Sequence, residues 1–312
     1  MTAIVTITPN PAVDLSTSVE QVVPVRKLRG LWQRRDPGGG GINVARVIKR
    51  LGGDASALYP IGGVTGDLLV RLLDKEGITS LTFPIAAETR EDFFVTETST
   101  HQPYRFVLPG PRLDESEWQE CLRLLSAIAP FPRYLVASGS LPGGVPDDFY
   151  ARLAAIAKRR GAIIILDTSG PALAAAVAEH VDLIKPNLGE MRELIGHEPS
   201  DAIEWEAAAK ALVHGGRAAT IALTMGHLGA ALVTRERVLR AAPLAITPVS
   251  AVGAGDSFLG ALVQGLASGS DLEQCFRQAV AAGAAALLNP GTELCRPDDV
   301  KRLAAQVTIK AA

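Results

Sequence analysis

The sequence is poor in cysteine. It has three cysteines in 312 residues, at positions 121, 275 and 295, and this odd number at wide spacing excludes a disulfide framework and a cysteine-based metal motif. Free thiols suit a reducing compartment, so we expect a cytoplasmic protein. We interpret all three cysteines as packing residues.

Long apolar runs and basic clusters are also missing. No run reaches the roughly 18 residues that a membrane span needs, and the N-terminus has a strand pattern in place of a signal peptide. The net charge is −2 at pH 7 without a block of lysine and arginine, which argues against a nucleic-acid or anionic-membrane partner. We therefore expect a soluble protein that acts on small molecules.

Apolar residues make up 47% of the chain, whereas aromatic residues make up only 5%. From about residue 130, apolar stretches of strand length alternate with helix patterns. The predicted strands are 134–137, 162–166, 183–184 and 219–223, and the predicted helices are 147–160, 171–179, one after Asn187, and 202–214. Continuous apolar strands between helices indicate a mainly parallel sheet covered on both faces. We expect one α/β domain over residues 1–312.

Two segments interrupt this alternation, at about residues 13–36 and 88–110. In the second, apolar and polar residues alternate around a turn at 99–102, which is typical of antiparallel strands with one solvated face. A small sheet buries little apolar surface by itself. We expect these two segments, called the lid below, to close over the core, to pair with a second copy, or both.

The motif Gly253-Ala254-Gly255-Asp256 precedes an apolar helix pattern. Glycines let the backbone turn and approach a ligand, and the free N–H groups that begin a helix bind anions. Asp256 beside such a site is explained if it takes a proton from a hydroxyl while the amides hold the transferred negative charge. Taken alone, the motif is better explained by an Asp N-cap on a glycine-rich loop.

A second glycine-rich loop, residues 38–41, also opens a helix. Its amides can approach a polar ligand, and Asn43 can both donate and accept, as a sugar diol requires. Asp14 follows the first strand and could accept from sugar hydroxyls. The alternatives are a flexible hinge for the glycines and a turn residue for Asp14.

Other polar groups follow later strands or lie in the lid. Glu190 could hold Mg²⁺ through water next to Lys185 and Asn187, or serve as the capping-box partner of Asn187. Thr224, Gly226 and Gly229 could cradle nucleotide phosphates. The lid cations Lys27, Arg29, Arg90 and Arg105 could bind a second, non-reacting phosphate, or could be solvated strand charges.

Together these motifs resemble the ribokinase-like (PfkB-type) sugar kinases, in their order and spacing and over nearly the whole chain. Within that family they are most similar to the branch that phosphorylates fructose 6-phosphate. The motifs that carry the resemblance are residues 27–29, 38–46, 104–110, 138–142, 187–190, 253–256 and 289–292.

The resemblance implies a ribokinase-like three-layer α/β/α sandwich with a β-sheet lid. It implies transfer of the ATP γ-phosphoryl group to the 1-hydroxyl of fructose 6-phosphate, with Asp256 as general base and the amides of 253–255 as anion hole. The implied sugar ligands are Asp14, Gly39, Gly40, Gly41, Asn43 and Ser140, with Arg90, Arg105 and Lys27 on the 6-phosphate. The implied nucleotide ligands are Lys185, Asn187, Thr224, Gly226 and Gly229.

The same resemblance implies Mg²⁺ organised by Glu190, and K⁺ held by groups of Ser250, Val252, Asn289 and Gly291. It implies a homodimer through the lids, with Lys27 or Arg29 reaching the neighbouring site, and inhibition by a second ATP. Two departures weaken the K⁺ prediction. Ala251 replaces a threonine of many relatives, and Glu293 stands where close relatives often have a basic residue.

Several alternatives stay open. 1-Phosphofructokinase and tagatose-6-phosphate kinase share the chemistry and differ in the sugar phosphate that the lid cations bind. A non-catalytic sugar-phosphate sensor would not need Asp256. An NAD-dependent oxidoreductase would need G-x-G-x-x-G after the first strand, where this chain has Asn10-Pro11-Ala12-Val13-Asp14.

Overall fold

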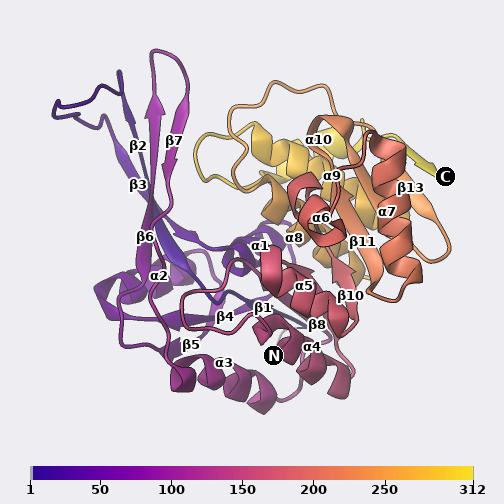
Figure 1. The fold of residues 1–312 in the computed structure, drawn as a ribbon. Helices are drawn as coiled ribbons and strands as arrows, with labels where there is room; N and C mark the ends of the chain where they lie inside the picture. The colour runs from indigo at the N-terminus through magenta and orange to yellow at the C-terminus, as the bar shows by residue number, and fades with distance from the viewer. Residues whose placement is uncertain (1–2, 312) are drawn as a thin grey trace.

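The computed structural model describes residues 3–311, which form a ten-stranded sheet and a four-stranded sheet (Figure 1). The strand order of the large sheet is β14-β13-β12-β11-β10-β9-β8-β1-β4-β5. The seven parallel strands are β5 (Thr79–Pro84), β4 (Ser56–Ile61), β1 (Ile4–Ile7), β8 (Tyr134–Ser138), β9 (Ile163–Asp167), β10 (Val181–Ile184) and β11 (Ala218–Thr224). Antiparallel strands β12 (Ala230–Thr234), β13 (Val238–Ala241) and β14 (Ile309–Ala311) extend one edge.

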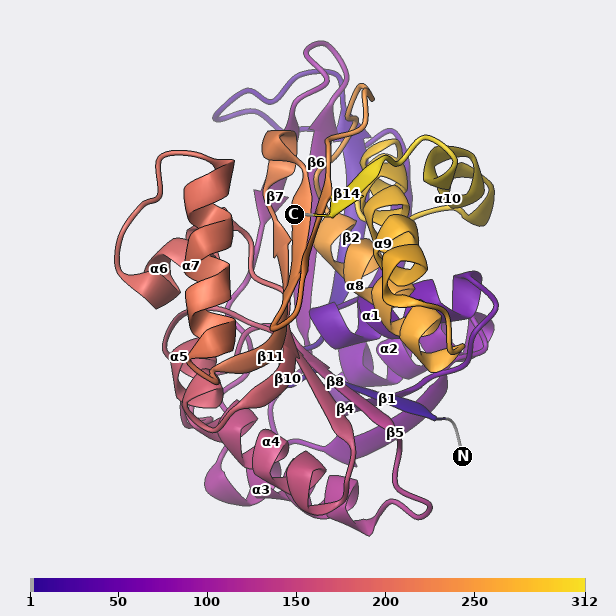
Figure 2. The ribbon, with the colours of Figure 1, turned by 90° about the vertical axis from the view of Figure 1, so that its right-hand side faces the viewer.

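Helices cover both faces of this sheet, as Figure 2 shows. One face carries α1 (Gly40–Arg50), α2 (Gly63–Lys75), α8 (Ala254–Ala267), α9 (Leu272–Leu287) and α10 (Pro297–Ala304). The other carries α3 (Glu115–Ala127), α4 (Phe149–Arg159), α5 (Gly170–Ala178), α6 (Leu188–Ile195) and α7 (Ala202–His214). Successive strand residues alternate between the two cores, so that Ile4 packs in one and Val5 in the other. The predicted three-layer sandwich is confirmed.

The predicted elements after residue 130 are present within two or three residues of their expected ends. Helix α7 has the predicted bounds because Asp201 caps it, accepting from the backbone N–H groups of Ile203 and Glu204. All three cysteines are buried and free, as expected for packing residues. Among residues 3–311, no helix is both long enough and apolar enough to cross a membrane.

The lid forms the four-stranded sheet, which projects from one end of the large sheet (Figure 1). Its strand order is β3 (Gln33–Gly38), β2 (Ala12–Val19), β6 (Arg90–Glu97) and β7 (Pro103–Phe106). The prediction of an antiparallel sheet is wrong for the central pair, because β2 and β6 run parallel over eight residue pairs. The reason is topological: β2 follows β1 and β6 follows β5, and both preceding strands run in the same direction in the large sheet. Only the outer pairs, β2–β3 and β6–β7, are antiparallel.

Candidate active site

Polar side chains gather at the carboxyl ends of the parallel strands, next to the start of α8. Asp167 ends β9, Lys185 follows β10, and Thr224 ends β11. Open parallel sheets bind their ligands at this edge. The start of α1, which carries the glycine-rich loop, lies at the same edge because Gly40 packs directly against Ser138 at the end of β8.

Helix α8 begins without a side-chain cap. Its N-cap is Gly253, in a left-handed conformation with φ 75°, and no side chain bonds to the N–H groups of the first turn. Asp256 lies within that turn, so the N-cap alternative for Asp256 is wrong. The uncapped amides of a helix N-terminus form an anion site.

The carboxylate of Asp256 is partly exposed and is held by one neighbouring side chain. Asn43 of α1 donates from its Nδ2 atom to Asp256 Oδ2 at 2.9 Å. Burial, followed by the charge of Asp167, raises the pKa of Asp256 to about 6, against the opposing effects of Asn43, Lys185 and Arg105. A carboxylate with a pKa near neutrality is suited to act as a general base.

Lys185 places a positive charge beside the anion site. The side chain is buried, and its Nζ atom lies 3.0 Å from Asp167 Oδ1. Burial opposes the charged form, but the carboxylates of Asp167, Glu190 and Asp256 together raise the pKa of Lys185. The ammonium group also lies next to Gly255, where a Cβ would stand 3.3 Å from Nζ. The ammonium group therefore lies close to the first turn of α8, which also carries Asp256.

The glycine-rich loop is fixed by close contacts. Gly39 has φ 109°, which favours glycine, and a Cβ on Gly40 would collide with Ser138 Oγ and lie 3.1 Å from the backbone N of Gly139. A Cβ on Gly41 would stand 2.9 Å from the carbonyl carbon of Ile7. The hinge alternative therefore lacks support, since these backbones are packed against each other.

Asp14 lies on β2 with its side chain buried against Gly38. Burial, followed by the charge of Asp92, raises the pKa of Asp14 to about 7, whereas Arg105 and Arg46 oppose this shift. Asp14 is thus an acid within the lid sheet, and the interpretation as a simple turn residue is wrong.

The other predicted ligands of the sugar phosphate, Ser140, Arg90 and Arg105, make contacts of three different kinds. Ser140 is exposed, and its Oγ accepts from Asn10 Nδ2 at 3.1 Å. Arg90 donates to the carbonyl oxygens of Leu108 and Asn10, at 3.1 and 3.2 Å. The guanidinium of Arg105 lies 5.1 Å from the ring centroid of Phe94 on the neighbouring strand.

Lys27 and Arg29 are exposed on the loop between β2 and β3, at the free end of the lid and away from α8 (Figure 1). Within one chain they are therefore not brought together with Asp14 and Asp256. Their contact with a sugar phosphate stays a prediction.

The other predicted nucleotide ligands lie at the start of α6, at the end of β11 and on the turn that follows β11. Asn187 and Glu190 form a capping box, in which Glu190 N donates to Asn187 Oδ1 at 2.9 Å and Asn187 N donates to Glu190 Oε2 at 2.8 Å. Thr224 is bridged to Asn187, so the two predicted nucleotide residues lie side by side. Gly226, with φ 57°, begins the short 3₁₀ turn Gly226–Leu228, and Gly229, with φ 92°, follows it.

The predicted K⁺ ligands lie on two neighbouring loops. Ser250 Oγ donates to the carbonyl oxygen of Gly291 at 3.0 Å and accepts from Val252 N at 3.2 Å. Asn289 is buried and donates to the carbonyl oxygens of Ala285 and Leu294. The site is therefore assembled in space, although its role remains a prediction.

The structure explains in part the two residues that depart from the family pattern, Glu293 and Ala251. Glu293 Oε1 accepts from Arg34 Nη1 and Glu293 Oε2 from Arg296 Nη2, both at 2.7 Å, so two arginines compensate the extra acid. Ala251 is exposed, so the residue at this position does not pack in the core.

In the described part of the chain, no cluster of three or more histidine, cysteine or acidic side chains could hold a metal ion. Glu190 is the predicted Mg²⁺ residue, and burial is the main reason that its pKa is raised. A single carboxylate near phosphates fits Mg²⁺, which usually keeps several waters and takes few protein ligands.

Asp167, the partner of Lys185, follows the predicted strand 162–166, and this position already indicated the edge where ligands bind. Sequence reasoning missed two other residues at this site. Asn10 lies in the loop that contacts Ser140. Arg46 is buried in α1 and donates to Asn43 Oδ1 at 3.3 Å, and its signal is a charge among apolar helix positions.

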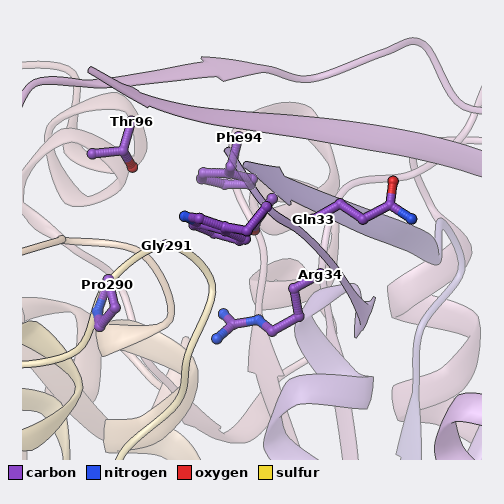
Figure 3. A pocket seen from close by; sticks show the side chains of 8 residues that line it. Gln33, Arg34, Phe94, Thr96, Pro290 and Gly291 are labelled. Atoms are coloured by element: carbon purple, nitrogen blue, oxygen red, sulfur yellow. The ribbon is translucent and has the colours of Figure 1, made fainter. Parts of the chain in front are cut away.

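A separate cavity of about 350 Å³ lies between the lid and the 290–291 loop (Figure 3). Trp32, Arg34 and Phe94 line it from the lid side, and Pro290 and Gly291 line it from the loop. Asp256 does not line it, so this cavity is distinct from the volume next to Asp256.

Residues 10–299 match the family model described as "pfkB family carbohydrate kinase". The chain belongs to this family. It therefore has the fold that the resemblance implied, and the match includes the lid, the glycine-rich loop and the motif at 253–256. A sugar-kinase fold is confirmed, and the NAD-dependent oxidoreductase alternative is excluded.

Relatives in this family are similar over almost the full chain. The ATP-dependent 6-phosphofructokinase isozyme 2 of Mycobacterium tuberculosis is 47% identical over 308 residues, covering 98% of this chain and 91% of that protein. The crystal structure of phosphofructokinase-2 from Escherichia coli in complex with potassium has a TM-score of 0.93 and 39% identity, covering 98% and 99% of the two chains. The 1-phosphofructokinase of Xanthomonas campestris is 34% identical, covering 98% of each chain.

Proposed function

We propose that the protein phosphorylates the 1-hydroxyl of fructose 6-phosphate with ATP and produces fructose 1,6-bisphosphate. The observation that carries this proposal is the placement of Asp256, which lies in the uncapped first turn of α8, is held by Asn43, and senses the charge of Lys185. Identity of 47% to an ATP-dependent 6-phosphofructokinase favours this substrate over fructose 1-phosphate.

In this proposal Asp256 accepts the proton as the sugar O–H bond breaks and the new O–P bond forms. The bond between the γ-phosphorus and the bridging oxygen breaks, and ADP leaves. The amides of 253–255 and the ammonium of Lys185 stabilise the negative charge on the transferred group. Base catalysis contributes roughly 10²–10⁴-fold to the rate, and an anion-hole donor contributes on the same order.

The nucleotide is proposed to lie along Asn187, Thr224, Gly226 and Gly229. Glu190 would hold Mg²⁺ through water, and the ion would neutralise charge on the ATP phosphates. Ser250, Val252, Asn289 and Gly291 would hold K⁺ beside the anion site, which is supported by the bond between Ser250 and Gly291. A relative, phosphofructokinase-2 of Escherichia coli, has a crystal structure in complex with potassium, which supports K⁺ as a ligand.

The sugar is proposed to lie between Asp14, the glycine-rich loop 39–41, Asn43 and Ser140. In the described chain the buried Asn10 Oδ1, next to Ser140, has no hydrogen-bond partner, so it can accept from a sugar hydroxyl. Arg90 and Arg105 would bind the 6-phosphate from the lid. We propose that residues 1–312 act as one kinase domain that includes the lid.

We further propose a homodimer through the lids, in which Lys27 or Arg29 reaches the neighbouring site. Large apolar side chains are exposed mostly on the lid and its loops, where contiguous apolar surface is typical of an interface. These residues are Val25, Leu28, Leu31, Trp32, Phe106, Val107 and Leu108. Phosphofructokinase-2 of Escherichia coli has a tetrameric inhibited form, so assembly of this chain into pairs of dimers, and inhibition by a second ATP, are part of the same proposal.

Turnover of fructose 6-phosphate, fructose 1-phosphate and tagatose 6-phosphate at equal ATP tests the substrate. We expect the highest kcat/KM with fructose 6-phosphate, and ³¹P NMR of the product should show a new phosphate ester at C1. A higher kcat/KM with fructose 1-phosphate would assign the 1-phosphofructokinase activity in its place. Binding of sugar phosphate without turnover would indicate the sensor.

A further inference from the structure

Arg46 of α1 is a buried charge with a complete set of acceptors. Its side chain is 1% exposed. Nε lies 2.9 Å from Glu76 Oε2 and Nη2 lies 2.6 Å from Glu76 Oε1, while Nη1 donates to the carbonyl oxygen of Pro37 at 2.8 Å. Removing a guanidinium from water carries a large desolvation penalty, and a buried ion pair of this kind is weak evidence for stability. Its remaining contact points to another role.

That contact is with Asn43, one helical turn earlier. Arg46 Nη1 lies 3.3 Å from Asn43 Oδ1. A guanidinium only donates, so the amide of Asn43 must turn its oxygen toward Arg46. Its nitrogen then faces Asp256, where it donates to Oδ2 at 2.9 Å. The reversed amide would set donor against donor at Arg46 and acceptor against acceptor at Asp256.

We propose that Arg46 is a positioning residue for the general base, acting through Asn43. It fixes the orientation of the Asn43 amide, which restrains one oxygen of Asp256 and leaves the other to accept the proton. This inference rests on the proposed role of Asp256.

Two elements, α2 and β3, hold Arg46 in place against α1. Glu76 is the C-cap residue of α2, Pro37 lies near the end of β3 of the lid, and Asp36 Oδ1 lies 3.9 Å from Arg46 Nη2. Loss of the guanidinium would reach Asp256 through one amide, although Arg46 does not contact Asp256.

The proposal is tested with the double variant Arg46→Met/Glu76→Leu. Replacing a buried ion pair by apolar side chains often preserves stability. We expect kcat to fall about tenfold or more, the scale of one hydrogen bond to a charged group. We also expect the acid limb of the pH profile to move to higher pH, because a free amide no longer favours the carboxylate. The matched control Glu76→Gln weakens the ion pair but leaves Arg46 bonded to Asn43, so it should keep both kcat and the pH profile.

Two further measurements separate this role from a structural one. Asn43→Ala should lower kcat by a similar factor, and adding it to the Arg46 variant should lower kcat little more, because both act on the hydrogen bond from Asn43 to Asp256. Because Asn43 is also a proposed sugar ligand, Asn43→Ala should in addition raise the KM for the sugar phosphate. In ¹³C-aspartate NMR of the enzyme without substrates, the carboxyl resonance that Asp256→Asn removes should titrate at higher pH in the Arg46 variant. Unchanged kcat and titration in the folded double variant would overturn the proposal, as would equal losses in Glu76→Gln or fully additive losses. Retained turnover of Asp256→Asn would instead remove the proposed role of Asp256 as the base, and the NMR titration would still report on Arg46.

Discussion

The ammonium of Lys185 lies 3.0 Å from the carboxylate of Asp167, and both charges act on Asp256. Asp167 raises the pKa of Asp256, whereas Lys185 lowers it. The lysine is therefore neutralised in part before any nucleotide binds, and it is held beside Gly255 at the start of α8. An arrangement of fixed charges around a base and an anion site lowers the cost of reorganisation during phosphoryl transfer.

The first prediction concerns Asp256→Asn. An amide can fill the same space but cannot accept a proton as a base, so we expect kcat to fall at least about a hundredfold. The KM values should change little, because the substitution leaves the substrate-binding groups in place. Steady-state kinetics with fructose 6-phosphate and ATP measure both constants, and a kcat within a few fold of the parent would remove Asp256 as the base.

The second prediction concerns pH. The base acts as a carboxylate, so activity should be full above the folded pKa of about 6 and should be lost as the pH falls through it. The profile of kcat/KM from about pH 5 to 9, corrected for ionisation of the substrate phosphates, should show this acid limb. A profile that stays flat on the acid side would contradict a base of raised pKa.

The third prediction is that Asp14→Asn stabilises the protein at high pH. The pKa of Asp14 is raised from 3.8 to about 7 in the folded state, so the folded chain binds a proton that the unfolded chain has lost. The contribution of Asp14 to the free energy of unfolding is thus largest below about pH 4. It falls as the pH rises to about 7 and stays low above that pH. Each tenfold change in proton affinity is worth about 1.4 kcal/mol.

Thermal unfolding on either side of this range, at about pH 8 and about pH 4, checks the prediction. Asp14→Asn should raise Tm at the higher pH and have little effect at the lower one, whereas activity should fall if Asp14 binds the sugar. Asp54, with its side chain 58% exposed, offers the control Asp54→Asn, which should show no such difference. A lower Tm of Asp14→Asn at both pH values would contradict the expected sign.

Much of the site could be predicted from local sequence. The glycines of 253–255 and the helix after them were sufficient to locate the anion site, and apolar runs located the strands that end at Asp167 and Thr224. The parallel pairing of β2 with β6 could not be predicted, because it joins segments far apart in the sequence. The same holds for the contacts of Asn43 with Asp256 and of Lys185 with Asp167, which depend on how distant elements pack.

The fourth prediction compares two glycines. In Gly40→Ala the new Cβ would collide with Ser138 Oγ and stand 3.0 Å from the backbone carbonyl carbon of Ser138. We therefore expect the free energy of unfolding to fall by about 2 kcal/mol or more. Gly189 lies in the first turn of α6, and a Cβ there meets only Asn187 Oδ1, at 3.2 Å. Gly189→Ala should therefore be neutral or slightly stabilising. Urea unfolding measures the free energy of unfolding of both variants. Equal values for Gly40→Ala and Gly189→Ala would contradict the prediction and show that the loop 38–41 can relax.

The fifth prediction concerns assembly. Phe106 lies on β7, opposite Phe93 of β6, and is 53% exposed. If the lids pair, Phe106→Asp should place a charge in an apolar interface and shift the protein toward the 32.8 kDa monomer. Light scattering after size-exclusion chromatography measures the mass.

The control for assembly is Ile203→Asp on α7, where the isoleucine is 65% exposed outside the lid. This variant should keep the mass of the parent. Loss of the dimer in both variants, or in neither, would contradict an interface formed by the lids.

The parallel ladder between β2 and β6 has a mechanical consequence. Asp14 is directly paired with Asp92, and Arg90 with Ala12, in one continuous set of backbone hydrogen bonds. The lid sheet connects to the large sheet through two segments, between β1 and β2 and between β5 and β6, so that any movement of the lid would carry β2 and β6 together. A sugar phosphate bound by Asp14 on β2 and by Arg90 on β6 would therefore lose both contacts at the same time when the lid moves.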